Sequence, residues 1–81
     1  MYNGFRNRET WIVNLYLQNT EHWYSYYSSL SKVMNKEELA ETIELDIRLL
    51  VPEEVPYLLS DLIEEVMRDI DWLVVAEHFY Y

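Results

Sequence analysis

The chain contains no cysteine, only one glycine and only two prolines among its 81 residues. The absence of cysteine excludes disulfide bonds and thiolate zinc sites. A single glycine is too few for a glycine-rich loop that cradles phosphate groups. The scarcity of glycine and proline disfavours a sheet protein with many tight turns. We therefore expect an all-α fold, a small bundle of four to five helices.

Long hydrophobic runs are also missing. The longest uninterrupted apolar runs are a few residues long, whereas about 20 apolar residues are needed to cross a bilayer. The N-terminus shows no apolar segment of the kind that a signal peptide contains. We therefore expect neither a signal peptide nor a membrane helix, and we expect a cytoplasmic protein.

Basic side chains are scarce in the second half of the chain. Residues 37–77 contain thirteen acidic side chains but only Arg48 and Arg68, a net charge of −11, whereas residues 1–36 have a net charge of +2. The overall charge of −9 should repel nucleic acid and anionic lipid. The charge distribution predicts basic protein partners, no direct nucleic-acid binding and no membrane binding.

The composition is that of a folded domain. Apolar residues make up 51% of the chain and include thirteen aromatic residues, far more than an acidic disordered tail contains. A chain of this length buries only about 60% of its unfolded surface. We expect one domain spanning residues 1–81, with modest stability.

The 3.6-residue apolar period predicts helices at residues 8–18, 21–34, 36–51, 57–70 and 72–78. Asn7, Thr20, Asn35 and Asp71 are suitable N-caps for four of them. Pro52 should end the third helix, since proline pushes the preceding residue out of the α region. In the fourth helix, five apolar residues should face inward. They are Leu59, Leu62, Ile63, Val66 and Ile70.

Catalytic and metal-binding patterns are weak. His22 and His78 have no second ligand or acid partner at a useful helical spacing. The serines between Ser25 and Ser31 lack the elbow and the acid and base partners of a nucleophile. We therefore expect no catalytic residue, no metal site and no cofactor, and a protein that is not an enzyme.

Two sets of carboxylates follow helical spacing. Glu37, Glu41 and Glu44 should line one side of the third helix. The fourth helix should present Asp61, Glu64, Glu65 and Asp69. Like charges at these spacings cost a few tenths of a kcal/mol per pair. One interpretation is a surface that keeps the protein soluble; the other is a partner-binding face whose carboxylates imitate DNA phosphates.

Tyrosine is abundant, with eight copies. Buried phenols need hydrogen-bond partners, and tyrosine is favoured at protein interfaces. Tyr24, Tyr26 and Tyr27 cannot all point to one side of a helix. Some of them must therefore be exposed, and we predict that these three residues take part in binding a protein partner.

Both ends of the chain carry motifs. Residues 2–11 read Tyr-Asn-Gly-Phe-Arg-Asn-Arg-Glu-Thr-Trp, and residues 71–78 read Asp-Trp-Leu-Val-Val-Ala-Glu-His. They resemble a group of small proteins encoded by phages, archaeal viruses and plasmids, which begin Tyr-Asn-Gly-aromatic, Asn-x-Glu-Thr-Trp and end Trp-x-x-(Ile/Val)-Ala-x-His. The group has no assigned activity, so the resemblance implies a mobile-element origin and a prokaryotic host cell but no mechanism. Phe5 and Tyr16 stand where the group usually has tryptophan.

Physically, the motifs should hold the fold together. Asn7 and Thr10 lie at a helix start, with Glu9 in its first turn. Trp11 should enter the core near Trp72, with its nitrogen donating to His78 or Glu9.

Two functional hypotheses follow. The first is a small acidic mobile-element protein that binds a basic host protein, as a DNA mimic inhibiting a defence or other nucleic-acid-binding protein. The alternative is a structural or adaptor protein that oligomerises, for instance as a homodimer, through its tyrosine-rich surface.

Overall fold

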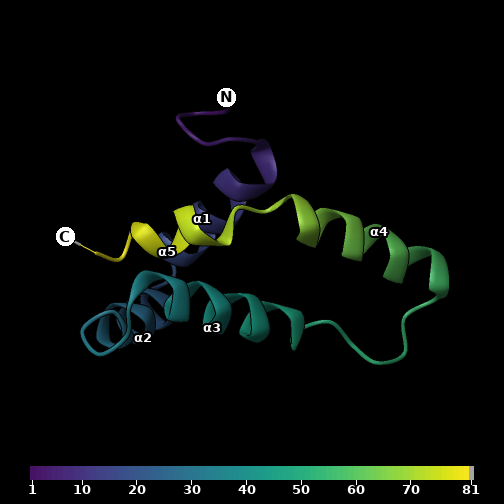
Figure 1. The fold of residues 1–81 in the computed structure, drawn as a ribbon. Helices are drawn as coiled ribbons and strands as arrows, with labels where there is room; N and C mark the ends of the chain where they lie inside the picture. The colour runs from purple at the N-terminus through teal and green to yellow at the C-terminus, as the bar shows by residue number, and fades with distance from the viewer. Residues whose placement is uncertain (81) are drawn as a thin grey trace.

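In a computed structural model, which describes residues 1–80, the chain forms five helices (Figure 1). In chain order they are α1 (Arg8–Asn19), α2 (Glu21–Leu30), α3 (Lys36–Arg48), α4 (Tyr57–Asp69) and α5 (Trp72–Glu77). Residues 1–80 contain no β-strand, so the all-α prediction is confirmed. None of the five helices has the length and apolar character needed to cross a membrane.

The starts of α1 and α3 follow their local sequence. The Asn7 side chain accepts a hydrogen bond from the Thr10 backbone N–H at 2.9 Å. Asn35 and Glu38 form a capping box, in which each side chain accepts from the other residue's backbone N–H, at 2.8 and 3.0 Å. These bonds satisfy amides that have no partner inside the helix. Thr20 precedes α2 as predicted, but its side chain makes no capping hydrogen bond.

Two helices end earlier than predicted. α2 ends at Leu30, and residues 31–34 form a turn in which the Ser31 hydroxyl donates to the Ser28 carbonyl at 2.7 Å. Serine side chains compete in this way with helical backbone bonds. α3 ends at Arg48, because Pro52 disfavours the helical conformation at Val51.

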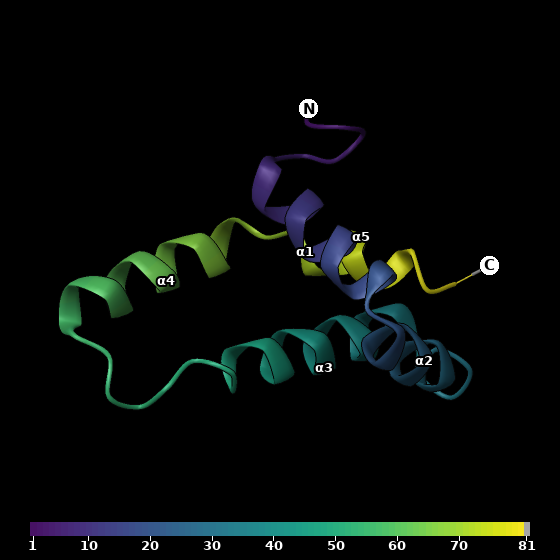
Figure 2. The same cartoon turned by 180° about the vertical axis from the view of Figure 1, so that it is seen from behind.

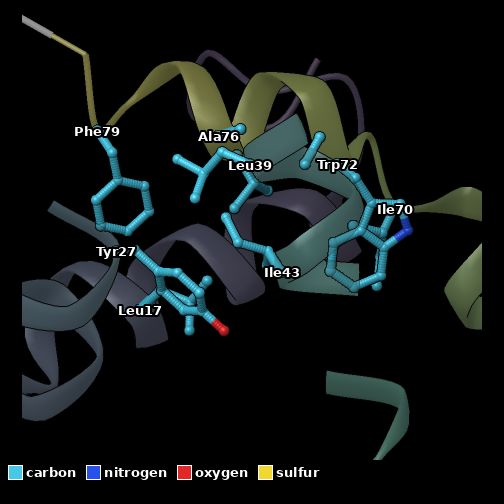
Figure 3. Close-up of a cluster of buried hydrophobic side chains, with 10 residues drawn as sticks. Leu17, Tyr27, Leu39, Ile43, Ile70, Trp72, Ala76 and Phe79 are labelled. Carbon is cyan, nitrogen blue, oxygen red and sulfur yellow. The ribbon is translucent and has the colours of Figure 1, made fainter. Parts of the chain in front are cut away.

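The core lies between α3 and α5, with α1 and α2 closing it (Figure 3). Its fully buried hydrophobic side chains come from all four helices and the segment after α5. They are Leu17, Tyr27, Leu39, Ile43, Val75, Ala76 and Phe79. Burying one large apolar side chain contributes about 1.5–3 kcal/mol. Most of the stability of the fold therefore comes from this four-helix contact.

α4 lies outside the core, contrary to the prediction that its apolar residues face inward. Figures 1 and 2 show that the C-terminal half of α3, the connector and α4 form a helical hairpin projecting from the core. We call residues 44–69 the arm. No α4 residue is buried, and Leu59, Leu62 and Val66 are 49%, 54% and 46% exposed. Ile70, just after the helix, is buried in the core, Met67 at the end of α4 packs against the core, and Ile63 is partly buried.

The position of α4 follows from that of α5. α5 begins only three residues after α4 ends, and α5 packs against α3 in the core. The helix that precedes it must then extend beyond the core, along the far half of α3. The two helices of the arm are joined by residues 49–56.

Candidate functional site

The solvent-facing side of the first half of α3 carries negative charge. Glu37 and Glu41, one turn apart, are both exposed. Within residues 1–80, no basic side chain forms an ion pair with either of them. The Glu38 carboxylate, exposed and committed to the capping box, lies on the same turn. The first half of α3 therefore presents uncompensated carboxylates to solvent.

Arg48 connects the carboxylates of α3 to those of α4. Its Nε donates to Glu44 at 2.9 Å, and its Nη1 donates to both carboxylate oxygens of Glu64 at 3.1 and 2.9 Å. Hydrogen bonds to Glu44 and then Glu64 raise the pKa of the Arg48 guanidinium. These side chains are a third to a half exposed, so solvent limits each pair to about 1 kcal/mol or less. Arg48 thus pairs with two of the predicted carboxylates, and because it carries one positive charge the three side chains together keep a net charge of −1.

The remaining carboxylates of α4 divide between paired and unpaired. Glu65 pairs with Arg68 at 3.0 Å. Asp61 and Asp69 are exposed, and no basic side chain in the described part of the chain pairs with either carboxylate. Of the seven predicted residues, four therefore have no ion-pair partner within residues 1–80. They are Glu37, Glu41, Asp61 and Asp69.

The three predicted surface tyrosines are not equivalent. Tyr27 is fully buried, and its hydroxyl donates to Asp46 Oδ2 at 2.8 Å, so it is a core residue and not a surface anchor. Burial and the Asp46 carboxylate raise the pKa of Tyr27. Tyr24 is partly buried beside Phe79, with ring centroids 6.1 Å apart. Only Tyr26 is well exposed, at 44%.

An apolar surface on α4 was missed by sequence reasoning. We call Leu58, Leu59, Leu62 and Val66 the α4 stripe. Their exposed fractions lie between 46% and 71%. Beside them is a shallow depression of about 240 Å³, lined by Leu62, Ile63, Val66 and Met67. The 3.6-residue period correctly indicated an apolar face, but periodicity alone does not say what covers it.

The N-terminal motif meets the chain between α4 and α5. Thr10 is fully buried; its hydroxyl donates to Asn7 Oδ1 at 2.6 Å and accepts from the Asp71 backbone N–H at 2.9 Å. Asn7 Nδ2 donates to the Asp69 carbonyl at 2.6 Å. The Asp71 side chain in turn accepts from the Val74 N–H at 3.2 Å and caps α5. Both ends of the chain are thus joined through one hydrogen-bonded junction.

Trp11 lies less deep than expected, whereas Trp72 is buried in the core. Trp72 is buried, and its Nε1 donates to the Met67 carbonyl at 3.3 Å. Trp11 is partly buried, and its ring lies 5.0 Å from that of Tyr2. His78 is exposed, and its Nδ1 lies 2.8 Å from the Val74 carbonyl. Glu9 lies in the first turn of α1, as predicted.

The opening Tyr-Asn-Gly-Phe segment forms a tight turn. The backbones of Tyr2 and Phe5 exchange two hydrogen bonds, at 2.6 and 2.8 Å. Asn3 and Gly4 between them have φ angles of 48° and 87°. Asn-Gly is the residue pair that tolerates two successive positive φ values. The turn places Phe5 in a buried position, against the His78 ring.

A family of unknown function, DUF7249, matches residues 1–77. The chain belongs to this family. The match extends over all five helices, and thus over the junction, the arm and both acidic helices of this DUF7249 protein. No curated protein and no solved structure shows significant similarity to it.

The histidines of this DUF7249 chain are both exposed. His22 borders a wide, open depression on α2 with Glu21, Ser25, Tyr26 and Ser29. Residues 1–80 contain no group of three or more histidine and carboxylate side chains that could hold a metal ion. The candidate site is therefore the arm and the acidic start of α3, where exposed charge and exposed apolar surface lie side by side.

Proposed function

We propose that this protein acts by binding another protein, and that its unpaired carboxylates recognise a basic surface on that partner. The observation that carries the proposal is the exposure of Glu37, Glu41, Asp61 and Asp69 without basic partners in residues 1–80. Exposed charges of one sign on two helices attract a partner of the opposite sign and raise the rate of encounter.

The partner is a basic host protein, with the nucleic-acid channel of a defence or other nucleic-acid-binding protein as the specific candidate. Carboxylates at helical spacing would occupy the positions that phosphates of a duplex take against lysine and arginine side chains. The resemblance of the terminal motifs to proteins of phages, archaeal viruses and plasmids supports an origin in a mobile element, where an inhibitor of this kind is useful in the cytoplasm of a prokaryotic cell.

An adaptor role is the second candidate, and a specific observation favours it. The tyrosine-rich surface is smaller than predicted, since Tyr27 is buried. The α4 stripe, in contrast, is an exposed apolar face of the kind that marks protein contacts. The adaptor hypothesis therefore rests on α4 rather than on the tyrosines of α2.

Charge-neutral variants test whether the unpaired carboxylates recognise a partner. Glu37→Gln with Glu41→Gln, and Asp61→Asn with Asp69→Asn, each remove two unpaired charges from one helix. A matched control removes two exposed charges elsewhere, with Glu21→Gln and Glu77→Gln. The partner is the protein that the wild-type chain captures from host lysate. We expect both test variants to stay folded and to associate with this partner at least about tenfold more slowly than the wild type at low salt.

The salt dependence is the second readout. Exposed charges are screened within about 8–10 Å at ionic strengths near 0.1–0.15 M. The wild-type association rate should fall with added salt, and the test variants should show a flatter dependence than the control. Equal rates and equal salt dependence for test and control variants would refute recognition through these carboxylates.

A further inference from the structure

We propose that α4 docks a basic amphipathic helix of the partner protein, with the partner's apolar side chains on the α4 stripe and its lysine or arginine side chains against the neighbouring carboxylates. This docking site belongs to the proposed protein-binding function, on which it rests, and assigns a defined structural element to the partner. α4 is a 13-residue helix without a buried residue. An isolated helix of this length is only marginally stable in water, and most helical stability in proteins comes from covering an apolar face.

Apolar and acidic residues form neighbouring rows along α4. Leu58, Leu62 and Val66 follow one another at four-residue spacing and form the apolar row. Each of them is followed three residues later by an exposed carboxylate, which lies about 60° around the helix from it. We call these carboxylates the acidic row: Asp61, Glu65 and Asp69. Because stripe and acidic row belong to one helix, they lie side by side whatever the rest of the chain does.

The stripe faces away from the rest of its own chain. Glu64, which Arg48 of α3 holds at 2.9 Å, lies about 160° around α4 from Leu62. Met67, which packs against the core, lies about 140° around the helix from Leu62. The Met67 carbonyl also accepts from Trp72 Nε1 at 3.3 Å. These contacts hold the opposite side of α4, so the stripe is left for a partner.

The charges beside the stripe select a basic occupant. Asp61 and Asp69 have no ion-pair partner within residues 1–80, and Glu65 pairs with Arg68 only through side chains that are 67% and 64% exposed. An uncharged apolar surface over the stripe would take water from these carboxylates without replacing its hydrogen bonds, which is unfavourable. A helix with lysine or arginine along one edge supplies those partners. A second copy, with its charge of −9, and anionic lipid would both be repelled.

The size of the surface fits a transient contact. α4 is about 20 Å long, and the four side chains of the stripe are between 46% and 71% exposed. The shallow depression of about 240 Å³ beside Leu62 and Val66 can receive one large apolar side chain of the partner helix. One helix face covers less than the roughly 600 Å² per partner of a stable interface. We therefore expect weak, charge-assisted binding, with a dissociation constant of about 10–500 µM.

A peptide titration tests the docking site. The full chain, labelled with ¹⁵N, is titrated with a synthetic helical peptide that has leucine at i, i+4, i+7 and i+11 and lysine along one edge of this apolar face. A control peptide has the same composition in scrambled order and no apolar face. We expect the patterned peptide to shift the amide resonances of α4 and to bind at least about tenfold more tightly than the scrambled peptide.

Variants of α4 separate the two parts of the contact. Leu58→Gln with Leu62→Gln should raise the dissociation constant for the patterned peptide at least about tenfold. Val33→Gln changes a residue that is 80% exposed and lies outside the arm, so it should leave binding unchanged. Asp61→Asn with Asp69→Asn should raise the dissociation constant at least about threefold at low salt and flatten its salt dependence.

Glu37→Gln with Glu41→Gln distinguishes the docking site from the proposed function. These carboxylates lie on α3 outside the arm, so this variant should bind the peptide as the wild type does, although it captures its partner more slowly. Unchanged partner capture by this variant would count against recognition through the α3 carboxylates and leave the docking site standing.

Three results would overturn docking on α4 and leave the α3 carboxylates unaffected. They are a patterned peptide that does not shift α4 resonances at about 1 mM, equal affinity for patterned and scrambled peptides, and stripe variants that bind as tightly as the wild type. Far-ultraviolet circular dichroism checks that the variants keep their helices, and Val66→Gln provides a second disruption if the double leucine variant unfolds.

Discussion

Thr10 joins the two ends of the chain, and its hydroxyl can be removed almost without changing its shape. Thr10→Val keeps the side-chain volume but loses the bond to Asn7 Oδ1 and the acceptor for the Asp71 N–H. Each lost hydrogen bond costs about 1 kcal/mol, and leaving a buried N–H without a partner adds about 1 kcal/mol or more. We therefore expect Thr10→Val to lower the free energy of unfolding by about 2–3 kcal/mol.

Thr10→Ser is the matched comparison, because it keeps the hydroxyl and removes one buried methyl group. That methyl contributes about 1 kcal/mol. A domain of this size has roughly 4–12 kcal/mol of total stability, and 1 kcal/mol shifts its Tm by about 4–8 °C. Thermal melts should place the Tm of Thr10→Val roughly 10–20 °C below that of the wild type, with Thr10→Ser between them. Urea denaturation followed by tryptophan fluorescence should give the same order of unfolding free energies. A valine variant as stable as the serine variant would refute the junction as a source of stability.

Two further predictions concern buried aromatic residues. Trp72→Ala should lower the free energy of unfolding by about 3–5 kcal/mol. Trp11→Ala should lower it clearly less, because Trp11 is only partly buried. Equal urea midpoints for the two variants would contradict this order. Tyr27→Phe removes a hydrogen bond to a carboxylate and should cost about 1.5–2 kcal/mol at neutral pH. The pKa of Tyr27 is raised in the folded protein. The contribution of the Tyr27 hydroxyl to the free energy of unfolding is therefore complete below the unfolded pKa of about 10 and is lost as the pH rises above that value. Stability should therefore fall less steeply above pH 10 in Tyr27→Phe, and parallel pH profiles would contradict this.

Local signals were sufficient to predict the helices from the sequence. Asn7 and Asn35 act on amides only three residues away, and Pro52 acts on the residue before it. Such short-range effects can be recognised in any sequence. The ends of α2 and α3 were less predictable, since serine competition and turn formation shorten helices by a few residues without a strong signal.

The arrangement of the candidate site depends on distant contacts, which the sequence does not reveal. Arg48 and Glu64 are 16 residues apart, so no helical spacing pairs them. Tyr27 and Asp46, 19 residues apart, meet only because α2 packs on α3. The apolar period of α4 was recognised, but whether α4 lies over the core depends on where α5 packs. The Arg48–Glu64 pair, the Tyr27–Asp46 hydrogen bond and the packing of α5 therefore decide which carboxylates, tyrosines and leucines are available to a partner.

The central claim is that the carboxylates of α3 and α4 occupy the nucleic-acid site of a basic partner. The most direct measurement is competition: the immobilised protein captures its partner from host lysate, and duplex DNA is then added in increasing amounts. We predict that DNA releases the partner, that a neutral polymer does not, and that the variants lacking Glu37 and Glu41 or Asp61 and Asp69 capture less of it. A partner that binds DNA and this protein at the same time would contradict the claim.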